Sequence, residues 1–373
     1  MSLTDKASIR GTEALTSSFN LPDYACCVLG RTGWRVARLG FGTSRCGITE
    51  PEHREALEKA LHGGINLIDT AANYLDGDAE SLIGEVLTQL VVWEAFDREG
   101  VVVVGKAGYL QGSQLQRAQQ MVAEGRGFPE AVQISPAHWH CMHPAFLEDQ
   151  LTLSLSRMHL DCLDVYLLHN PEYLLSHYLQ EGMDREAAEA TFYGQIRQAF
   201  LALEKLVQEG LIQYYGISSN GFPLPATEAR HVSLARVWRA YQDVCLQLGM
   251  SVEEGHFGCI QLPYNLLERG AREEKNNPWQ GNRVSVLELA KKLGLGVLVN
   301  RPLNPIDGGT LVRLAGNAGG GIQEEVTRLI PEQALQGTAL QFVLNTPGVD
   351  VVLKGMPRPR DVDQAIQVMQ QLA

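Results

Sequence analysis

Apolar and polar residues follow one another in repeating blocks along most of the chain. Short continuous apolar runs, such as residues 101–104, are typical of strands buried on both faces. Longer stretches with apolar residues three and four positions apart, such as 52–64, predict helices with one buried face. The predicted strands are 39–42, 65–69, 101–106, 163–169, 212–218, 257–262, 296–300 and 350–355. The predicted helices are 52–64, 79–90, 146–158, 195–210, 284–294, 335–346 and 360–371, with one more inside 229–249.

Strands and helices alternate, and counting from Leu39 there are eight strand–helix units. Alternation with apolar strands implies a parallel sheet covered by helices. Eight units favour closure of that sheet, so the predicted fold class is α/β, a TIM (β/α)8 barrel. An open doubly wound sheet is the alternative. It is disfavoured because no G-x-G-x-x-G fingerprint follows the first strand.

The remaining segments complete the predicted organisation. Residues 1–25 are polar and aperiodic, and we expect a loose N-terminal extension; residues 26–373 are expected to form one domain. Two short strands around Gly30–Gly33 predict an N-terminal β-hairpin. Long connections run from Gly108 to about His143 and from Asn170 to about Tyr193. Since both follow strands, we expect them on the C-terminal face of the barrel, where long loops shape substrate access.

Composition and charge narrow the range of functions. The 373 residues include 43 acidic and 31 basic ones, and this acidic excess argues against a general nucleic-acid-binding protein. No apolar run reaches the length of a membrane span, so no membrane partner is expected. The first twenty residues lack an apolar signal core, which favours a cytoplasmic protein. The seven scattered cysteines are expected to be free thiols.

Polar residues stand where consecutive predicted strands end. Asp69, Lys106 and His169 end the second, third and fourth strands, and Tyr74 follows closely after Asp69. Each of them alone has an ordinary structural explanation: a helix cap, a solvated strand end, a satisfied polar side chain or a packing ring. In a barrel, however, all four would converge on the C-terminal face, where reaction centres lie. Their joint placement therefore predicts a catalytic site.

These four side chains suit protonation of a substrate oxygen. A phenol has a pKa of about 10 and becomes a better acid when a nearby ammonium stabilises its anion. We therefore expect Lys106, held by Asp69, to favour the phenolate of Tyr74, and His169 to donate to a carbonyl oxygen. The set offers no nucleophile for an acyl-enzyme and no evident metal cage. Carbonyl reduction by a nicotinamide hydride fits best.

Six separated motifs resemble, in order and spacing, those of the aldo-keto reductases: GINLIDTAANY, VVVVGK, LDVYLLH, YYGISSN, CIQLPYN and RPLNPIDGGTL. The resemblance covers about residue 26 to the C-terminus. It implies a TIM barrel that binds NADP(H), with NAD(H) as the alternative, and that reduces a small-molecule aldehyde or ketone. It also implies that Tyr74 donates the proton, that Lys106 and Asp69 tune it, and that His169 orients the carbonyl.

The same resemblance implies a set of cofactor-binding residues. Ser218, Ser219, Asn220 and Gln261 match the contacts to the nicotinamide carboxamide, and an adjacent pair among the first three would share that role. Charged residues after the last strand match the site of the adenosine 2′-phosphate. The complete implied set is Gly42, Thr43, Asp69, Ser218, Ser219, Asn220, Gln261, Asn300, Arg301, Leu303, Gly309, Lys354, Gly355, Arg358 and Arg360.

Three features depart from the family pattern or fall outside it. Asn300 stands where the family commonly has an aromatic residue that stacks on the nicotinamide, and residues 75–79 lengthen the spacing after Tyr74. The segment 138–143 contains His138, His140, Cys141 and His143, which could ligate a metal, but its spacing matches no zinc pattern. A role for Trp139 in walling a substrate pocket is the preferred interpretation, and no metal site is predicted.

Two other functions remain open from the sequence. One is an NAD-dependent dehydrogenase of a sugar or polyol, in which the long connections would recognise hydroxyl groups. The other is a regulatory subunit that binds the cofactor without turnover, as some relatives of the aldo-keto reductases do. The presence of all four catalytic residues favours an enzyme.

Overall fold

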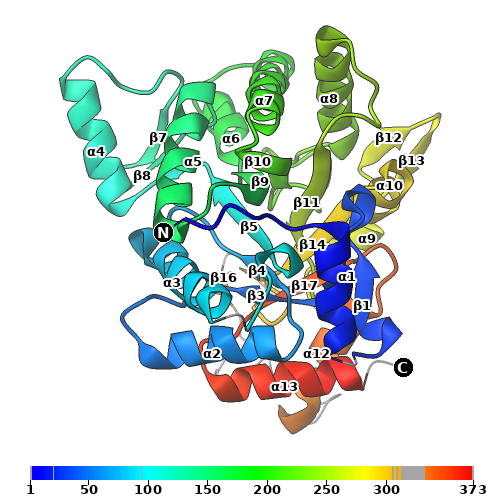
Figure 1. Cartoon of the computed structure of the whole chain (residues 1–373). Coiled ribbons are helices and arrows are strands. Elements are labelled where there is room, and N and C mark those ends of the chain that lie inside the picture. The colour runs from blue at the N-terminus through cyan, green and yellow to red at the C-terminus, as the bar shows by residue number, and fades with distance from the viewer. Residues whose placement is uncertain are drawn as a thin grey trace.

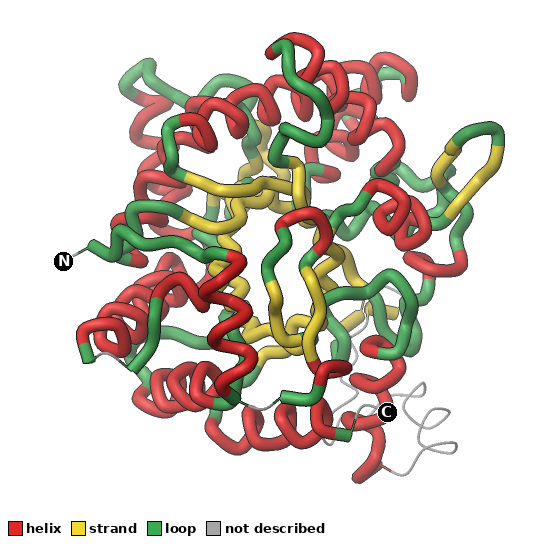
Figure 2. Tube along the Cα trace, turned by 45° about the vertical axis from the view of Figure 1, so that its right-hand side comes forward, coloured by secondary structure: helices red, strands yellow, loops and turns green. Residues whose placement is uncertain are grey.

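Eight parallel strands close into a barrel in the computed structural model, which describes residues 2–19, 21–93, 95–304, 306–307, 310–311 and 332–371. Figure 2 shows the strands as a ring with helices outside it. Each strand pairs with the next in the chain, and the last pairs with the first. The predicted TIM barrel is therefore confirmed. Its strands are β3 (Leu39–Gly42), β4 (Leu67–Asp69), β5 (Val102–Ala107), β9 (Leu163–His169), β10 (Ile212–Ser218), β11 (Phe257–Pro263), β14 (Gly296–Asn300) and β17 (Val351–Gly355).

Helices surround the barrel and bury their apolar faces against it (Figure 1). The predicted helices are present, with ends that differ by a few residues except where noted below. The helices that follow barrel strands are α2 (Pro51–His62), α3 (Asp78–Val92), α5 (Pro144–Met158), α7 (Arg185–Gln208), α8 (Leu234–Leu248), α10 (Val286–Leu293), α12 (Glu332–Leu344) and α13 (Pro359–Gln370).

Side chains alternate between two apolar clusters along each barrel strand. Val102 and Val104 of β5 belong to a cluster inside the barrel, whereas Val101 and Val103 pack outward against the helices. The same alternation places Val165 and Leu167 of β9 inside. This period of two is the pleat of a strand, and it fills the barrel with side chains. It also decides which residues face the axis at the strand ends.

Both long connections contain regular structure of their own. The first holds α4 (Gly112–Ala123) and a small antiparallel sheet of β6 (Tyr109–Leu110), β8 (His138–His140) and β7 (Val132–Ser135), in that order. The second holds α6 (Glu172–Gln180) and the first turns of α7. The prediction that the latter helix starts at residue 195 was wrong. It starts at Arg185, because the carboxylate of Asp184 caps it by accepting a hydrogen bond from the amide of Ala187.

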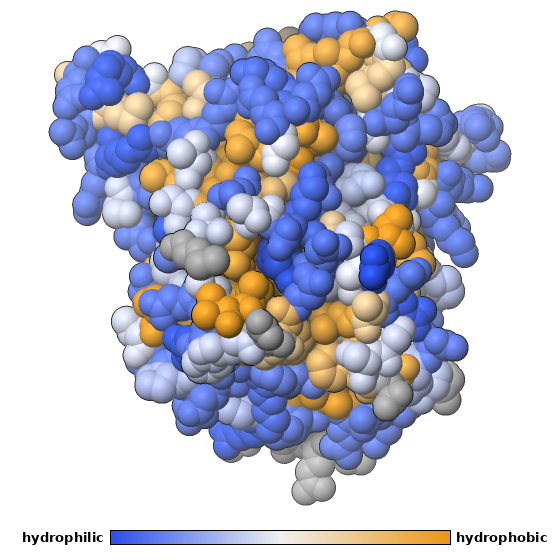
Figure 3. Space-filling model, viewed as in Figure 1, coloured by the Kyte–Doolittle hydropathy of each residue, from blue (hydrophilic) through white to orange (hydrophobic). Residues whose placement is uncertain are grey.

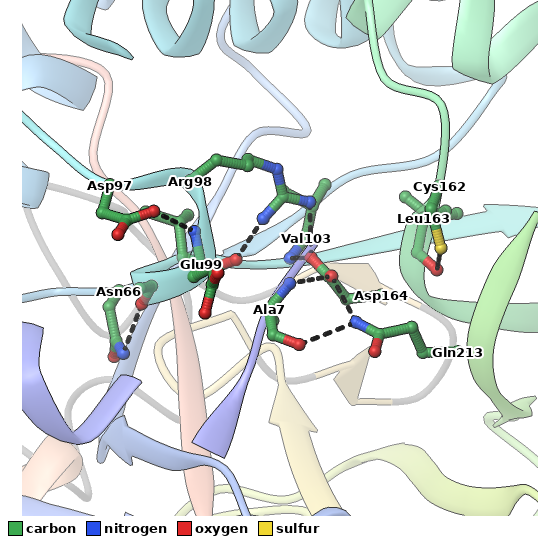
Figure 4. A network of polar contacts seen from close by, with 12 residues as sticks. Ala7, Asn66, Asp97, Arg98, Glu99, Val103, Cys162, Leu163, Asp164 and Gln213 are labelled. Atoms are coloured by element: carbon green, nitrogen blue, oxygen red, sulfur yellow. Dashed lines mark hydrogen bonds and ion pairs between the residues drawn. The ribbon is translucent and has the colours of Figure 1, made fainter. Parts of the chain in front are cut away.

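The expectation of a loose segment before residue 26 was also wrong. It contains α1 (Ile9–Ser18), which begins at the capping residue Ser8, and Ala7 packs inside the barrel. The amide of Ala7 donates to Asp164 Oδ1 over 2.8 Å (Figure 4). Asp164 also pairs with Arg98 over 2.7 Å, and both side chains are fully buried. The segment thus runs across the N-terminal end of the barrel and joins it there.

An N-terminal hairpin lies beside this segment, as predicted. Its strands are β1 (Cys26–Val28) and β2 (Arg35–Ala37), and Trp34 and Val36 join the cluster inside the barrel. Gly30 lies so close to the backbone of Gly296 that a Cβ would come within 2.1 Å of its nitrogen, so a glycine is required there. The division into an extension and one domain stays a prediction.

Smaller elements complete the described chain. They are α9 (Gly270–Glu273), the hairpin β12 (Asn277–Trp279) and β13 (Asn282–Val284), and the pair β15 (Ile306–Asp307) and β16 (Thr310–Leu311). Figure 3 shows hydrophilic residues over much of one face, with hydrophobic residues between them in limited patches. All seven cysteines are free thiols, as predicted. In the described part of the chain, no helix has the length and apolarity that crossing a bilayer requires.

Candidate active site

The axis-facing residues at the C-terminal ends of the eight strands form one layer. The alternation that puts Val104 and Leu167 inside the barrel also puts Lys106 and His169 there. Strand pairing aligns Gly42 with Asp69 and Gly355 with Gly42. The layer consists of Gly42, Asp69, Lys106, His169, Ser218, Gln261, Asn300 and Gly355. Every one of these is a residue that the sequence predicted for the site.

A buried ion pair forms the base of this layer. Lys106 Nζ lies 2.6 Å from Asp69 Oδ1 and 2.6 Å from the carbonyl oxygen of Thr70. The two residues are 1% and 4% exposed. Burial lowers the pKa of Lys106, because the ammonium is desolvated, and the carboxylate of Asp69 works against that shift. The pair holds the ammonium group in one position under the cavity.

Tyr74 lies next to this pair. It begins a short turn of 3-10 type, Tyr74–Gly77, in which Leu75 and Asp76 have left-handed backbone angles. Lys106 Nζ lies 5.0 Å from the centre of the Tyr74 ring. The extra residues after Tyr74 thus form a tight turn that returns the chain to α3, at a cost in backbone strain of about 1–3 kcal/mol for each left-handed residue.

The pKa of Tyr74 is not lowered overall in this structure, contrary to what we expected from the nearby Lys106. Burial of the phenol raises its pKa well above the ordinary value, and the carboxylate of Asp69 raises it further. The main physical reason is that burial desolvates the phenol and disfavours its anion. In addition, Asp69 offsets the charge of Lys106, so that the phenol is next to an ion pair rather than a free cation. Tyr74 is therefore held in its protonated form.

His169 faces Tyr74 edge to face, with ring centres 6.0 Å apart. Burial lowers the pKa of His169 well below its ordinary value, and the nearby charge of Lys106 acts in the same direction. The imidazole is therefore neutral and carries one N–H. Its Nδ1 is buried and has no hydrogen-bond partner among the described residues. A ring in this state can donate to a substrate oxygen without competing for the proton of Tyr74.

An amide network connects the ion pair with the neighbouring strands. Gln261 Nε2 donates to Asp69 Oδ1 over 2.7 Å. Its other atom, Oε1, accepts from Ser218 Oγ over 2.9 Å and from Asn300 Nδ2 over 3.3 Å. Asn300 Oδ1, by contrast, is buried without a partner in the described structure. An unpaired buried acceptor beside a cavity is suited to an amide N–H of a ligand.

Ser219 faces away from this network. Its hydroxyl donates to Glu172 Oε2 over 2.7 Å, and the backbone amide of Asn220 donates to Glu172 Oε1 over 3.0 Å. Glu172 is 1% exposed, and burial raises the pKa of its carboxyl to about 7. Glu172 therefore braces the turn after β10, and only Ser218 and Asn220 of the three predicted residues face the cavity side.

A cavity of about 390 Å³ opens above the layer. Its wall contains three of the four predicted catalytic residues, and Lys106 lies beneath it. At one side two adjacent glycines, Gly42 and Gly355, leave space that side chains would fill. The lining residues are Gly42, Ser44, Arg45, Asp69, Tyr74, His169, Asn170, Asn220, Asn300, Arg301, Pro302, Leu303, Asn304, Leu353, Lys354, Gly355 and Pro357.

Several predicted cofactor residues do not line this cavity. Thr43 is buried, and its hydroxyl donates to the carbonyl oxygen of Asp69 over 3.0 Å. Arg358 and Arg360 are exposed, and Arg358 pairs with Asp361. Gly309 lies outside the described residues. Lys354 does line it, although its Nζ donates to the carbonyl oxygen of Asp361 over 2.8 Å and burial lowers its pKa to about 8.

The segment 138–143 has structural contacts in place of a pocket wall. His143 caps α5, and the thiol of Cys141 donates to the carbonyl oxygen of Pro129. Trp139 packs against the helical core and does not line the cavity, contrary to the preferred interpretation. In the part of the chain that the structure describes, no group of three or more His, Cys, Asp or Glu side chains could hold a metal ion.

The residues at the site that were not predicted from the sequence include Asn170, Glu172 and Arg45. Asn170 follows His169, has a left-handed φ of 51°, and its amide donates to the carbonyl oxygen of Ser218 over 2.7 Å. Position was their only sequence signal: Asn170 and Glu172 come one and three residues after His169, and Arg45 comes two residues after Thr43.

A model of the aldo/keto reductase family matches residues 38–311 of the chain, which is more than half of it. The chain belongs to the aldo/keto reductase family. This match begins just before β3 and includes Asp69, Tyr74, Lys106 and His169.

Two curated relatives are similar to this chain at low sequence identity. The uncharacterized oxidoreductase YqkF of Bacillus subtilis (strain 168) is 25% identical over 193 residues, or 51% of this chain and 47% of that protein. The NADH-specific methylglyoxal reductase of Escherichia coli (strain K12) is 24% identical over 283 residues, or 74% of this chain and 66% of that protein. The chain thus matches less than two thirds of the length of either.

A solved aldo/keto reductase extends the comparison to structure. The crystal structure of the enzyme from Klebsiella pneumoniae, in complex with NADP and acetate, has a TM-score of 0.57 and 20% identity to this chain. The likeness covers 94% of this chain and 91% of that one. At this identity the comparison supports the barrel fold, which extends beyond the segment that the family model matches.

Proposed function

We propose that this protein is an NAD(P)H-dependent reductase that converts an aldehyde or ketone to an alcohol, with Tyr74 as the proton donor. The observation that carries the proposal is the buried pair of Lys106 and Asp69 beneath Tyr74, with neutral His169 facing the same ring. Membership of the aldo/keto reductase family supports it. When bound, NAD(P)H supplies the hydride, and the chain's own residues supply the proton and the geometry.

The cavity fits a nicotinamide cofactor in two respects. Asn300 Oδ1, which has no partner among the described residues, can accept from the carboxamide of a nicotinamide, and Asn220 can donate to that carboxamide. The space beside Gly42 and Gly355 leaves the wall open for a flat or extended group. The bound NADP of the Klebsiella enzyme supports a cofactor of this class.

Two basic residues fit the phosphates of such a cofactor. Lys354 and Arg45 both line the cavity, and phosphate oxygens are strong acceptors for such donors. Arg301 also lines it, and its Nε is buried without a partner among the described residues. We therefore propose NADP(H) as the cofactor, with NAD(H) as the alternative.

The proton leaves from the phenol oxygen of Tyr74. The raised pKa keeps Tyr74 protonated until negative charge develops on a substrate oxygen, and only then does transfer become favourable. Lys106 then stabilises the resulting phenolate, because its ammonium cannot move away from the ring. His169 orients the carbonyl by donating from its single N–H.

The substrate is proposed to be a small polar carbonyl compound. Next to His169 the described cavity wall contains Asn170, whose side-chain amide can form hydrogen bonds with a polar substrate. The Escherichia coli relative is a methylglyoxal reductase, which is consistent with this class. The sugar or polyol dehydrogenase is the same chemistry in reverse on a larger hydroxylated substrate.

The test is a fluorescence titration of the purified protein with NADPH and NADH, followed by a panel of aldehydes and ketones that includes methylglyoxal. We expect binding of at least one nucleotide and its oxidation on addition of a carbonyl compound. Tyr74→Phe should lower kcat by about a hundredfold or more while leaving nucleotide affinity within about threefold. Turnover by this variant near the wild-type rate would contradict the role of Tyr74. Binding of the nucleotide without turnover of any compound would support the regulatory function instead.

A further inference from the structure

His140 contacts the backbone of His169 from an element that the proposed mechanism does not use. His140 ends β8, in the small sheet that follows β5. Its Nε2 lies 2.8 Å from the carbonyl oxygen of His169, and the side chain is fully buried. Since a carbonyl oxygen only accepts, His140 donates from Nε2 and its Nδ1 carries the lone pair. The tautomer of this ring is thereby fixed.

The approach of His140 to His169 depends on Gly108. A Cβ at position 108 would come within 2.4 Å of the carbonyl oxygen of His169 and within 2.8 Å of His140 Nε2. The carbonyl of Gly108 also accepts from the amide of Cys141, which ties the end of β8 to this point. A glycine therefore leaves the space that the hydrogen bond occupies.

Among the described residues, the imidazole of His169 has no hydrogen-bond partner that fixes its orientation. Its Nδ1 is buried and unpartnered, although a functional histidine is commonly oriented through its second nitrogen. Its orientation comes instead from its own backbone and from the ring of Tyr109, whose centre is 4.6 Å away. Tyr109 pairs with His140 across β6 and β8, and its hydroxyl contacts the side chain of Asn170.

We propose that His140 is a positioning residue for His169 in carbonyl reduction. By holding the carbonyl of the last β9 residue, it fixes where that strand ends and hence the direction in which the imidazole projects into the cavity. His140 itself is 0% exposed and does not line the cavity, so it acts only through His169. The inference rests on the proposed function, since it assigns His169 a role in that reaction.

Three variants separate positioning from stability. His140→Leu removes the donor and leaves the carbonyl of His169 unpaired; we expect kcat to fall by about tenfold with KM changed by less than about threefold. His140→Gln retains an N–H at similar reach and should recover most of that loss. Tyr166→Phe is the matched control. Tyr166 lies on β9, the strand that ends at His169. It is 1% exposed, and its hydroxyl donates to the carbonyl oxygen of Leu147 over 3.1 Å.

Tyr166→Phe should lower the melting temperature as His140→Leu does, while kcat stays at the wild-type value. If both variants lower kcat equally, or if His140→Leu retains full kcat, the positioning role is refuted. Failure of the glutamine variant to restore kcat, while its melting temperature recovers, would also contradict it.

An NMR measurement on protein labelled with ¹⁵N at histidine keeps this test independent of turnover. We expect the signals of a neutral ring protonated at Nε2 that are absent from His140→Leu, which assigns them to His140. The ring signals of His169 should shift in His140→Leu and stay in place in Tyr166→Phe. If wild-type protein turns over no carbonyl compound, the proposed function fails. A His140 ring protonated at Nδ1 overturns the present inference whether or not there is turnover.

Discussion

Gln261 and Lys106 donate to the same oxygen of Asp69, over 2.7 and 2.6 Å. Gln261, which the family resemblance assigns to the nicotinamide carboxamide, is thus one hydrogen bond away from the Lys106–Asp69 pair beneath Tyr74. A change at Gln261 should therefore affect both cofactor binding and catalysis. We expect Gln261→Leu to raise the dissociation constant of the nucleotide and to lower kcat, each by about tenfold, since a buried network loses its partners. Fluorescence titration and steady-state kinetics measure the two effects. An effect on affinity alone would show that Asp69 keeps its position without Gln261.

Lys106→Met removes one member of a buried ion pair. The charge of Asp69 is then left unpaired, and we expect the free energy of unfolding to fall by about 3–5 kcal/mol. Activity should fall by about a hundredfold or more, because no ammonium stabilises the phenolate of Tyr74. Adding Asp69→Asn to the first variant should restore part of the stability and none of the activity. If the double variant regains activity, Lys106 has only a structural role.

Glu172 should make stability depend on pH. Burial raises the pKa of its carboxyl from 4.5 to about 7, so the folded protein holds this proton more tightly than the unfolded chain does. The carboxyl therefore contributes its full stability below about pH 4.5, and this contribution is lost as the pH rises through 7. At about 1.4 kcal/mol per pH unit the total change is about 3 kcal/mol.

Urea unfolding of the wild type and of Glu172→Gln at pH 4.5 to 8 measures this effect. We expect the wild type to lose stability relative to the variant as the pH rises across this range. Parallel curves for the two proteins would show that the Glu172 carboxyl titrates normally.

Lys354 predicts a pH-dependent preference between the two nucleotides. Burial lowers its pKa to about 8, so its ammonium form is lost as the pH rises above that value. If Lys354 binds the 2′-phosphate, the dissociation constant of NADPH should be constant below pH 7 and rise by up to about tenfold per pH unit above 8. The dissociation constant of NADH, which lacks the 2′-phosphate, should not rise in this way. Lys354→Met should abolish the difference, and a pH-independent NADPH affinity would place the phosphate elsewhere.

Substitution of Asp164 should lower the stability of the protein without affecting catalysis. Its two oxygens accept from Arg98, from the amides of Ala7 and Val103, and from the side chain of Gln213. We expect Asp164→Asn to lower the free energy of unfolding by about 3–5 kcal/mol, because Arg98 is left buried and unpaired. Asp363→Asn, which breaks the exposed pair with Lys59, should change it by less than about 1 kcal/mol. Equal effects of the two substitutions would refute the importance of the buried network.

The period of the hydrophobic pattern predicted the barrel, and the position of polar residues at strand ends predicted its central layer. Apolar runs identified the strands, and because side chains alternate along a strand, residues at strand ends such as Lys106 and His169 had to point to the axis. Ser219 follows the same alternation, which turns its side chain away from the barrel axis. It is the middle residue of the predicted Ser-Ser-Asn set, and it points away to Glu172.

Contacts between distant segments account for what the sequence did not predict. The helix Ile9–Ser18 has no strong apolar stripe, and it is held by tertiary contacts such as that of Gly11 with Glu99. The pKa of Tyr74 was misjudged because the sequence does not show how strongly burial desolvates the phenol, and this desolvation is the main cause of its raised pKa. The hydrogen bond between His140 and His169 joins elements whose connection could not be read from their spacing.

The position of Ala7 has a consequence for how the chain folds. Its two side-chain partners at the base of the barrel, Asp164 and Gln213, come 157 and 206 residues later in the sequence. When the chain is made from its N-terminus, Ala7 leaves the ribosome long before either partner exists. Such non-local contacts also form late and slowly in refolding. Ala7 is thus synthesised well before both partners and is among the described residues that reach their native neighbours late.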